Sequence, residues 1–124
     1  MIRKIRLTAL VLTLTLGSLL AHAADISGKW TGKFITPVGI NNYTYNFQVT
    51  GNVLTGDTNS SDTGKSVVQN GKFDGNNLSF TEPSKYNGNA ITVKYTGVVQ
   101  GETIKLTRTF GDFPPDSFVI KRAK

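Results

Sequence analysis

Carboxylates are the main acid–base groups that this sequence offers for chemistry, because the chain has no Cys and its single His is His22. Two carboxylates on either side of a cleft form the arrangement that hydrolyses glycosidic bonds. Acidic residues in loops more often face solvent or cap turns. We therefore expect a protein that is not an enzyme and has no catalytic residues, with hydrolysis by loop carboxylates as an open alternative. The acids concerned are Asp57, Asp62, Glu82, Asp112 and Asp116.

Metal ligands are equally sparse. The lack of Cys, and of His after His22, excludes Ser-His-Asp and Cys-His catalysis and any His- or Cys-ligated zinc or copper site beyond that residue. The segment Asp57–Asp62 offers oxygen ligands, but it lacks the closely spaced acids and the terminal Glu of a calcium-binding EF-hand loop. We expect neither a metal nor a cofactor.

Aromatic and amide side chains are the third kind of functional group, and they gather at predicted long connections. Aromatic faces beside amides suit sugars or small amphipathic ligands. In the alternative interpretation, the rings close off a hydrophobic core and the Asn residues serve turns. The candidate ligand-binding residues are Tyr43, Tyr86, Asn87, Arg108, Phe110 and Phe113.

Arg108 shares strand parity with Leu106 and Phe110, which predicts that it points inward, towards ligand space or a buried carboxylate. A buried Arg without a partner is costly. The alternative is a bulge after Thr107 that turns Arg108 outward. The sequence leaves both possibilities open.

The segment Gly111–Ser117 is the most distinctive connection because it contains two adjacent Pro residues. Proline stiffens a loop, and a stiff loop that carries Phe113 would present this ring to a partner protein with little loss of entropy. Recognition of another protein through this segment is therefore a second functional hypothesis.

Strand-period alternation covers the chain from residue 25 onward, and we find no helix-period segment there. In Asn42–Thr50, four apolar residues alternate with polar ones, which predicts one buried face and one solvated face. Eight strands are expected: Asp25–Ile35, Asn42–Thr50, Val53–Gly56, Ser66–Phe73, Leu78–Thr81, Ile91–Val99, Thr103–Phe110 and Phe118–Arg122.

The predicted connections alternate between long and short along the chain. Tight turns are expected at Gly51-Asn52, Asp74–Asn77 and Gln100–Glu102. Longer connections are expected at Thr36–Asn42, Asp57–Lys65, Glu82–Asn89 and Gly111–Ser117. Successive connections of an antiparallel meander lie at opposite ends, so the long ones should meet at one end. Closing the sheet removes its exposed edges. We therefore predict an all-β, eight-stranded, antiparallel up-and-down barrel with a loop-rimmed mouth.

The first 23 residues have the pattern of a secretory signal peptide. A basic start, Met1–Arg6, precedes an apolar stretch, Leu7–Leu20, and a small-x-small site at Ala21–Ala23. The apolar stretch is too short for a transmembrane anchor. We expect cleavage near Ala23, a single domain over residues 24–124, a periplasmic or secreted bacterial protein, and no membrane anchor after cleavage.

Removal of this leader would lower the net charge. The whole chain carries a formal charge of +6, and three basic residues, Arg3, Lys4 and Arg6, belong to the leader. Eleven basic and eight acidic residues then remain, a net charge of +3 without charge runs. We expect no nucleic-acid partner, and a monomer that meets a small molecule or an exported protein.

The start of the first strand, Ser27-Gly28-Lys29-Trp30, resembles the Gly-x-Trp opening of the calycin barrels, the lipocalins and avidins. In those families the Trp plugs the closed end of the barrel, and a basic residue of the last strand packs over its ring. The resemblance implies these roles for Trp30 and Arg122. The chain is also similar to small bacterial exported domains with an Ile-Ser-Gly-x-Trp start, a resemblance that implies no function. Together these observations favour an exported, non-enzymatic binding module.

Overall fold

The computed structural model of the protein describes residues 25–36 and 39–123. The predicted signal peptide and its cleavage site lie outside the described residues. The strands are β1 (Gly28–Thr36), β2 (Gly39–Thr50), β3 (Val53–Ser60), β4 (Gly64–Val67), β5 (Gln69–Asp74), β6 (Asn77–Tyr86), β7 (Asn89–Gln100), β8 (Thr103–Phe110) and β9 (Asp116–Arg122). Nowhere in these two ranges is there a helix with the length and hydrophobicity needed to cross a membrane.

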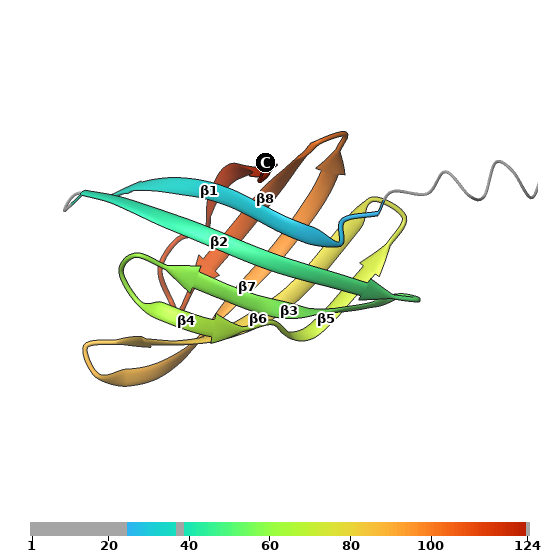
Figure 1. Ribbon diagram of the computed structural model, residues 1–124. Coiled ribbons are helices and arrows are strands. Elements are labelled where there is room, and N and C mark those ends of the chain that lie inside the picture. The colour runs from blue at the N-terminus through green and yellow to red at the C-terminus, as the bar shows by residue number, and fades with distance from the viewer. Residues whose placement is uncertain (1–24, 37–38, 124) are drawn as a thin grey trace, which may run out of the picture.

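The strands form one closed antiparallel barrel (Figure 1). Strands that follow each other in sequence are paired, except β4 and β5, and β1 pairs with both β2 and β9, which closes the ring. The segments β4 and β5 both pair with β3, so they share one position in the barrel. The predicted eight-stranded up-and-down barrel is confirmed, and its architecture is compatible with a calycin-like fold.

The predicted strand Ser66–Phe73 is interrupted at Val68. The ladder with β6 shifts register between Gln69 and Lys72. Within this shift, Asn70 has a positive φ of 54°, a conformation that turns a strand out of its regular path. The amide of Val68 still donates a hydrogen bond to the Gly56 carbonyl, at 2.9 Å, so β3 bridges the break.

The three tight turns lie together at one end of the barrel, on the right in Figure 1. Each is a two-residue hairpin turn, formed by Gly51-Asn52, Gly75-Asn76 and Gly101-Glu102. The Gly at the first position has a φ between +62° and +64° in all three. Glycine reaches this conformation without steric cost, which is why the turn positions could be predicted from the sequence.

The connections at the other end are mostly strand, so the prediction of long loops there was wrong. β6 and β7 continue into the predicted loop Glu82–Asn89 and leave only Asn87-Gly88 as the turn, with φ values of 51° and 80°. β3 likewise continues to Ser60. Pairing with a neighbouring strand has overridden the weak strand propensity of these polar segments. The segment that stays irregular is 111–115, between β8 and β9.

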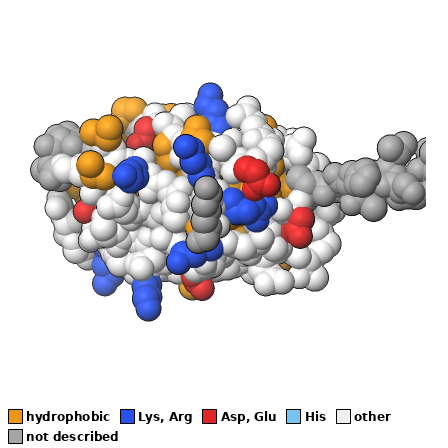
Figure 2. All heavy atoms as spheres, turned by 45° about the horizontal axis from the view of Figure 1, so that its top comes forward, with side chains coloured by type: hydrophobic (Ala, Val, Ile, Leu, Met, Phe, Trp, Pro, Cys, Tyr) orange, Lys and Arg blue, Asp and Glu red, His pale blue; other side chains and the backbone are white. Residues whose placement is uncertain are grey.

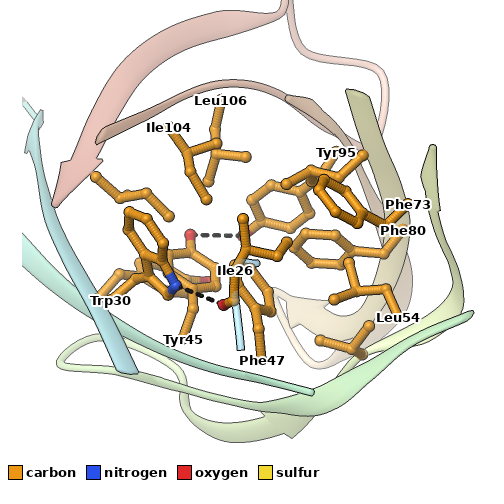
Figure 3. Packing of buried hydrophobic residues seen from close by; sticks show 14 of the residues in the cluster. Ile26, Trp30, Tyr45, Phe47, Leu54, Phe73, Phe80, Tyr95, Ile104 and Leu106 are labelled. Carbon is orange, nitrogen blue, oxygen red and sulfur yellow. Dashed lines mark hydrogen bonds between the residues drawn. The ribbon is translucent and has the colours of Figure 1, made fainter. Parts of the chain in front are cut away.

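Side chains fill the interior of the barrel (Figure 3). The predicted inward face of β2 is confirmed, since Tyr43, Tyr45 and Phe47 are each at most 3% exposed. The rings of Phe80 and Tyr95 stack across β6 and β7 with centroids 4.4 Å apart. This ring contact stabilises the packing of β6 beside β7 inside the barrel.

The closed end is sealed by Trp30 and by Ile26, which precedes β1. Trp30 is fully buried, and its indole Nε1 donates a hydrogen bond to the Ile26 carbonyl at 2.9 Å. Arg122 lies over the indole, with Cζ 4.5 Å from the ring centroid. The same guanidinium donates hydrogen bonds to the carbonyls of Asp25, at 2.8 Å, and Ser27, at 3.1 Å. Arg122 thereby holds residues 25–27 against the closed end of the barrel.

Candidate functional site

A pocket of about 490 Å³ opens at the end of the barrel opposite Trp30. Five of the six residues selected from the sequence line it: Tyr43, Tyr86, Arg108, Phe110 and Phe113. The sixth, Asn87, occupies the β6–β7 turn and is not among the lining residues. The remaining lining residues are Asn41, Asp62, Thr63, Lys85, Pro114 and Asp116.

Three aromatic rings form one wall of this pocket. Tyr86, at the end of β6, meets Phe110, at the end of β8, edge to face with centroids 6.1 Å apart. Phe113 packs against both, at 5.3 Å from Tyr86 and 6.0 Å from Phe110. A backbone hydrogen bond from the Phe113 amide to the Phe110 carbonyl, at 3.0 Å, turns the loop back so that the rings meet. Tyr86 and Phe113 remain about half exposed.

Arg108 points into the barrel, so the alternative of a bulge that turns it outward was wrong. The β7–β8 ladder runs without a break to its end, and Arg108 faces Tyr95 across it. The guanidinium carbon lies 4.1 Å from the ring centroid of Phe34, 5.4 Å from that of Phe110 and 5.8 Å from that of Tyr43. Aromatic faces therefore surround the cation on several sides.

The positive charge of Arg108 is only weakly paired with a carboxylate. Its side chain is 13% exposed, and its nearest carboxylate oxygen, Oδ1 of Asp116, lies 3.9 Å from Nε. This distance is too long for a hydrogen bond, and the buried Nε has no hydrogen-bond partner among the described residues. Asp116 is itself 57% exposed and belongs to β9, directly opposite Arg108 in the ladder.

A buried carboxyl group, Glu82, adjoins Tyr43 of this pocket and was not expected from the sequence. Glu82 is 2% exposed and accepts hydrogen bonds from the hydroxyls of Tyr43 (3.3 Å), Tyr95 (3.1 Å) and Thr58. Tyr45 extends the network by donating to the Tyr95 hydroxyl at 3.2 Å. Burial raises the pKa of all three tyrosines.

The position of Glu82 corrects its assignment to a solvated loop. It follows Leu78 and Phe80 at the same strand parity, and this continued alternation was the sequence signal for burial. The ion pairs of the described residues join Arg108 to Asp116 and Arg122 to Glu102. Glu82 is thus satisfied by hydroxyl groups, and it is not the ion-pair partner of Arg108.

Of the other acids of this end, two line the pocket and two lie outside it. Asp57 is exposed on the outer wall, where its Oδ1 accepts a hydrogen bond from Asn46 at 2.7 Å. Asp112 is exposed in the loop, whereas Asp62 and Asp116 line the pocket. Over residues 25–36 and 39–123, no three acidic or metal-ligating side chains are grouped to hold a metal ion.

Two hollows along the outer wall of the barrel differ in chemistry from the mouth. A hollow of about 630 Å³ over β5 to β8 includes the exposed side chains of Lys72, Asn77 and Lys105. Another, of about 390 Å³, is lined by Lys29, Asn46 and Asp57 among other polar residues. Neither contains an aromatic side chain. The mouth pocket joins half-exposed rings to a nearly buried cation, which makes it the best candidate for recognition.

Comparison of this chain with protein-family models, with curated proteins and with solved structures found no match.

Proposed function

We propose that this protein is an exported, non-enzymatic binding module that takes a small amphipathic molecule or a sugar into the mouth pocket. The observation that carries the proposal is the convergence of Tyr86, Phe110 and Phe113 with Arg108 around one pocket. A few polar groups set among apolar and aromatic walls are typical of small-molecule sites.

The size of the pocket suits such a ligand. Its volume of about 490 Å³ falls within the usual range for small-molecule sites, roughly 300–1,000 Å³. Tyr86 and Phe113 are 47% and 48% exposed, so a flat apolar group that covers their rings would remove this surface from water. Burial of apolar surface supplies roughly 25 cal/mol per Å² of favourable free energy.

The scaffold beneath the pocket supports binding with little reorganisation. Phe110 and Arg108 belong to a ladder that is regular to its end, and Tyr86 terminates the paired strand β6. Groups held in place before the ligand arrives lower the entropic cost of association. The proposed ligand would therefore contact the ends of paired strands and one short loop.

The calycin-type assignment belongs to the same proposal. The arrangement of Trp30 beneath Arg122 at the closed end agrees with what the resemblance to lipocalins and avidins implies. A barrel with one end sealed in this way leaves the opposite end for a ligand.

Recognition of a protein partner through Gly111–Ser117 remains the alternative proposal. Ile35 and Ile40, 90% and 59% exposed, lie opposite each other in the β1–β2 hairpin and add apolar surface outside the pocket. In Figure 2, hydrophobic side chains gather at the left-hand end of the molecule. The packing of Phe113 on Tyr86 and Phe110 favours the small-molecule proposal, because it makes this ring part of a pocket wall.

The test is a titration of the protein with N-phenyl-1-naphthylamine, a neutral apolar dye that fluoresces when it is shielded from water. We expect saturable binding that Tyr86→Ala and Phe113→Ala each weaken by about tenfold, the effect of losing a well-packed aromatic contact. Asn52→Ala and Asn76→Ala, in the tight turns at the opposite end, are the controls and should leave the affinity unchanged. Dye binding that responds to the control variants and not to the aromatic ones would overturn the proposal.

A further inference from the structure

We propose that the ligand of the mouth pocket is an amphipathic organic anion whose negative group is bound by Arg108, and that Asp116 competes with it for this cation. The inference rests on the proposed function and adds the charge class of the ligand. Its starting point is the guanidinium of Arg108, whose side chain is 13% exposed and whose ion pair with the exposed Asp116 is long, at 3.9 Å, and leaves Nε without a hydrogen bond among the described residues.

The environment of Arg108 keeps its charge available. The faces of Phe34, Tyr43 and Phe110 attract the cation but contain no hydrogen-bond acceptor in their rings. An Arg side chain has five N–H donors. Of these donors, Nε has no hydrogen-bond partner among the described residues, whereas the side chain of Tyr95 is a hydrogen-bond partner of the guanidinium. A nearly buried cation without a close carboxylate is costly, and an anion that enters the pocket would reduce this cost by pairing with its charge.

The geometry limits how the anion would approach. Nε is shielded from solvent and faces Asp116, whereas the side chain as a whole lines the pocket. The ligand would therefore meet the terminal Nη groups, which offer parallel N–H bonds to a carboxylate or sulfonate. The half-exposed rings of Tyr86 and Phe113 would cover the apolar body of the same molecule.

The other charged groups of the pocket lie at its exposed rim. Lys85 and Asp62 are exposed, and they carry opposite charges. Arg108 is therefore the one cation among the lining residues that is withdrawn from solvent. Asp116, at 3.9 Å, is close enough to lower the positive potential at Arg108 and too distant to satisfy its Nε.

A matched pair of dyes tests this inference. 1-Anilinonaphthalene-8-sulfonate has the same two ring systems as N-phenyl-1-naphthylamine and adds one sulfonate. The measured quantity is the ratio of the two affinities, anionic over neutral, for each variant at fixed salt. We expect Arg108→Gln to lower this ratio by about tenfold or more, the loss that follows removal of charge-assisted hydrogen bonds.

Asp116→Asn provides a readout that leaves Arg108 in place, in case Arg108→Gln does not fold. We expect this variant to raise the ratio by about twofold to fivefold, the factor that corresponds to a partly exposed ion pair. Asp112→Asn is the matched control, because Asp112 is an exposed acid of the adjacent loop and does not line the pocket. It removes the same charge and should leave the ratio unchanged.

The outcomes separate this inference from the proposed function. An equal affinity for both dyes, unaffected by Arg108→Gln or Asp116→Asn, would overturn the anion inference and leave the binding module standing. Equal increases in the ratio for Asp116→Asn and Asp112→Asn would also overturn it, because they would reveal only the effect of net charge. Failure of both dyes to bind would refute the proposed function and the anion inference with it.

Discussion

The hydroxyl group of Tyr95 donates a hydrogen bond to Oε1 of Glu82 across 3.1 Å in the interior of the barrel. Tyr43 and Thr58 donate to the same carboxyl group. The carboxyl group of Glu82, on β6, is therefore hydrogen-bonded to side chains of three other strands, β2, β3 and β7. A buried acceptor with several donors fixes the relative positions of these strands. The network adjoins the mouth pocket through Tyr43, whose ring lines that pocket.

Replacement of Glu82 by Leu should destabilise the fold, because the buried hydroxyls lose their acceptor. An unsatisfied buried polar group costs about 1–3 kcal/mol, so we expect the free energy of unfolding to fall by at least that amount. Glu82→Gln retains an acceptor oxygen and should cost less. Urea unfolding followed by Trp30 fluorescence measures both variants. Addition of Tyr43→Phe and Tyr95→Phe to Glu82→Leu should restore part of the loss; a further loss would contradict this account.

Trp30→Ala should lower the free energy of unfolding by about 3–5 kcal/mol, the usual cost of truncating a large core side chain. Arg122→Ala should also destabilise, because the indole face and the carbonyls of Asp25 and Ser27 lose their partner. Glu102→Gln is the control. Glu102 is 78% exposed, so its ion pair with Arg122 should contribute at most about 1 kcal/mol. A red-shifted, solvent-exposed emission maximum for Trp30 in the folded protein would refute its role as the plug.

The stability of the barrel should fall as the pH rises above 10. Burial raises the pKa values of Tyr43, Tyr45 and Tyr95 above the ordinary value of 10.0. Above pH 10 the unfolded chain loses phenolic protons that the folded chain retains, so rising pH favours unfolding. Below pH 10 these groups are protonated in both states and their contribution is complete.

Absorbance at 295 nm, recorded with circular dichroism, measures this alkaline transition. We expect the three buried phenols to ionise only together with loss of the β-sheet signal. The variant Tyr45→Phe should have one phenol fewer in that step. Ionisation of all four tyrosines of the chain near pH 10, with the sheet signal intact, would contradict the prediction.

Gly56→Ala should destabilise the barrel more than Gly75→Ala. Gly56 has a φ of +150°, and an added Cβ would lie 1.8 Å from the carbonyl oxygen of Asn46 in β2. Gly75 also has a positive φ, +63°, but an added Cβ would meet nothing within 4 Å. We expect Gly75→Ala to cost about 1–2 kcal/mol from backbone strain alone. Thermal unfolding of the two variants compares them directly, and equal midpoints would show that β2 and β3 separate easily here.

The sequence by itself determined which side chains of a strand share a face and the end at which the tight turns lie. Alternation with a period of two decides which side chains of a strand share a face, as in Tyr43, Tyr45 and Phe47. Gly51, Gly75 and Gly101 mark turns because each turn needs a positive φ. These are local properties of the chain, so they can be predicted without knowledge of the fold.

Only the tertiary structure decided the length of the mouth hairpins, the burial of Glu82 and the environment of Arg108. A polar segment such as Glu82–Asn89 has little strand propensity of its own, and pairing between β6 and β7 extends it. Glu82 is buried because hydroxyls from β2, β3 and β7 satisfy its carboxyl group. Arg108 acquires its aromatic surroundings from β1, β2 and β8 together. Each of these features depends on side chains distant in sequence, and closure of the barrel is what brings them together.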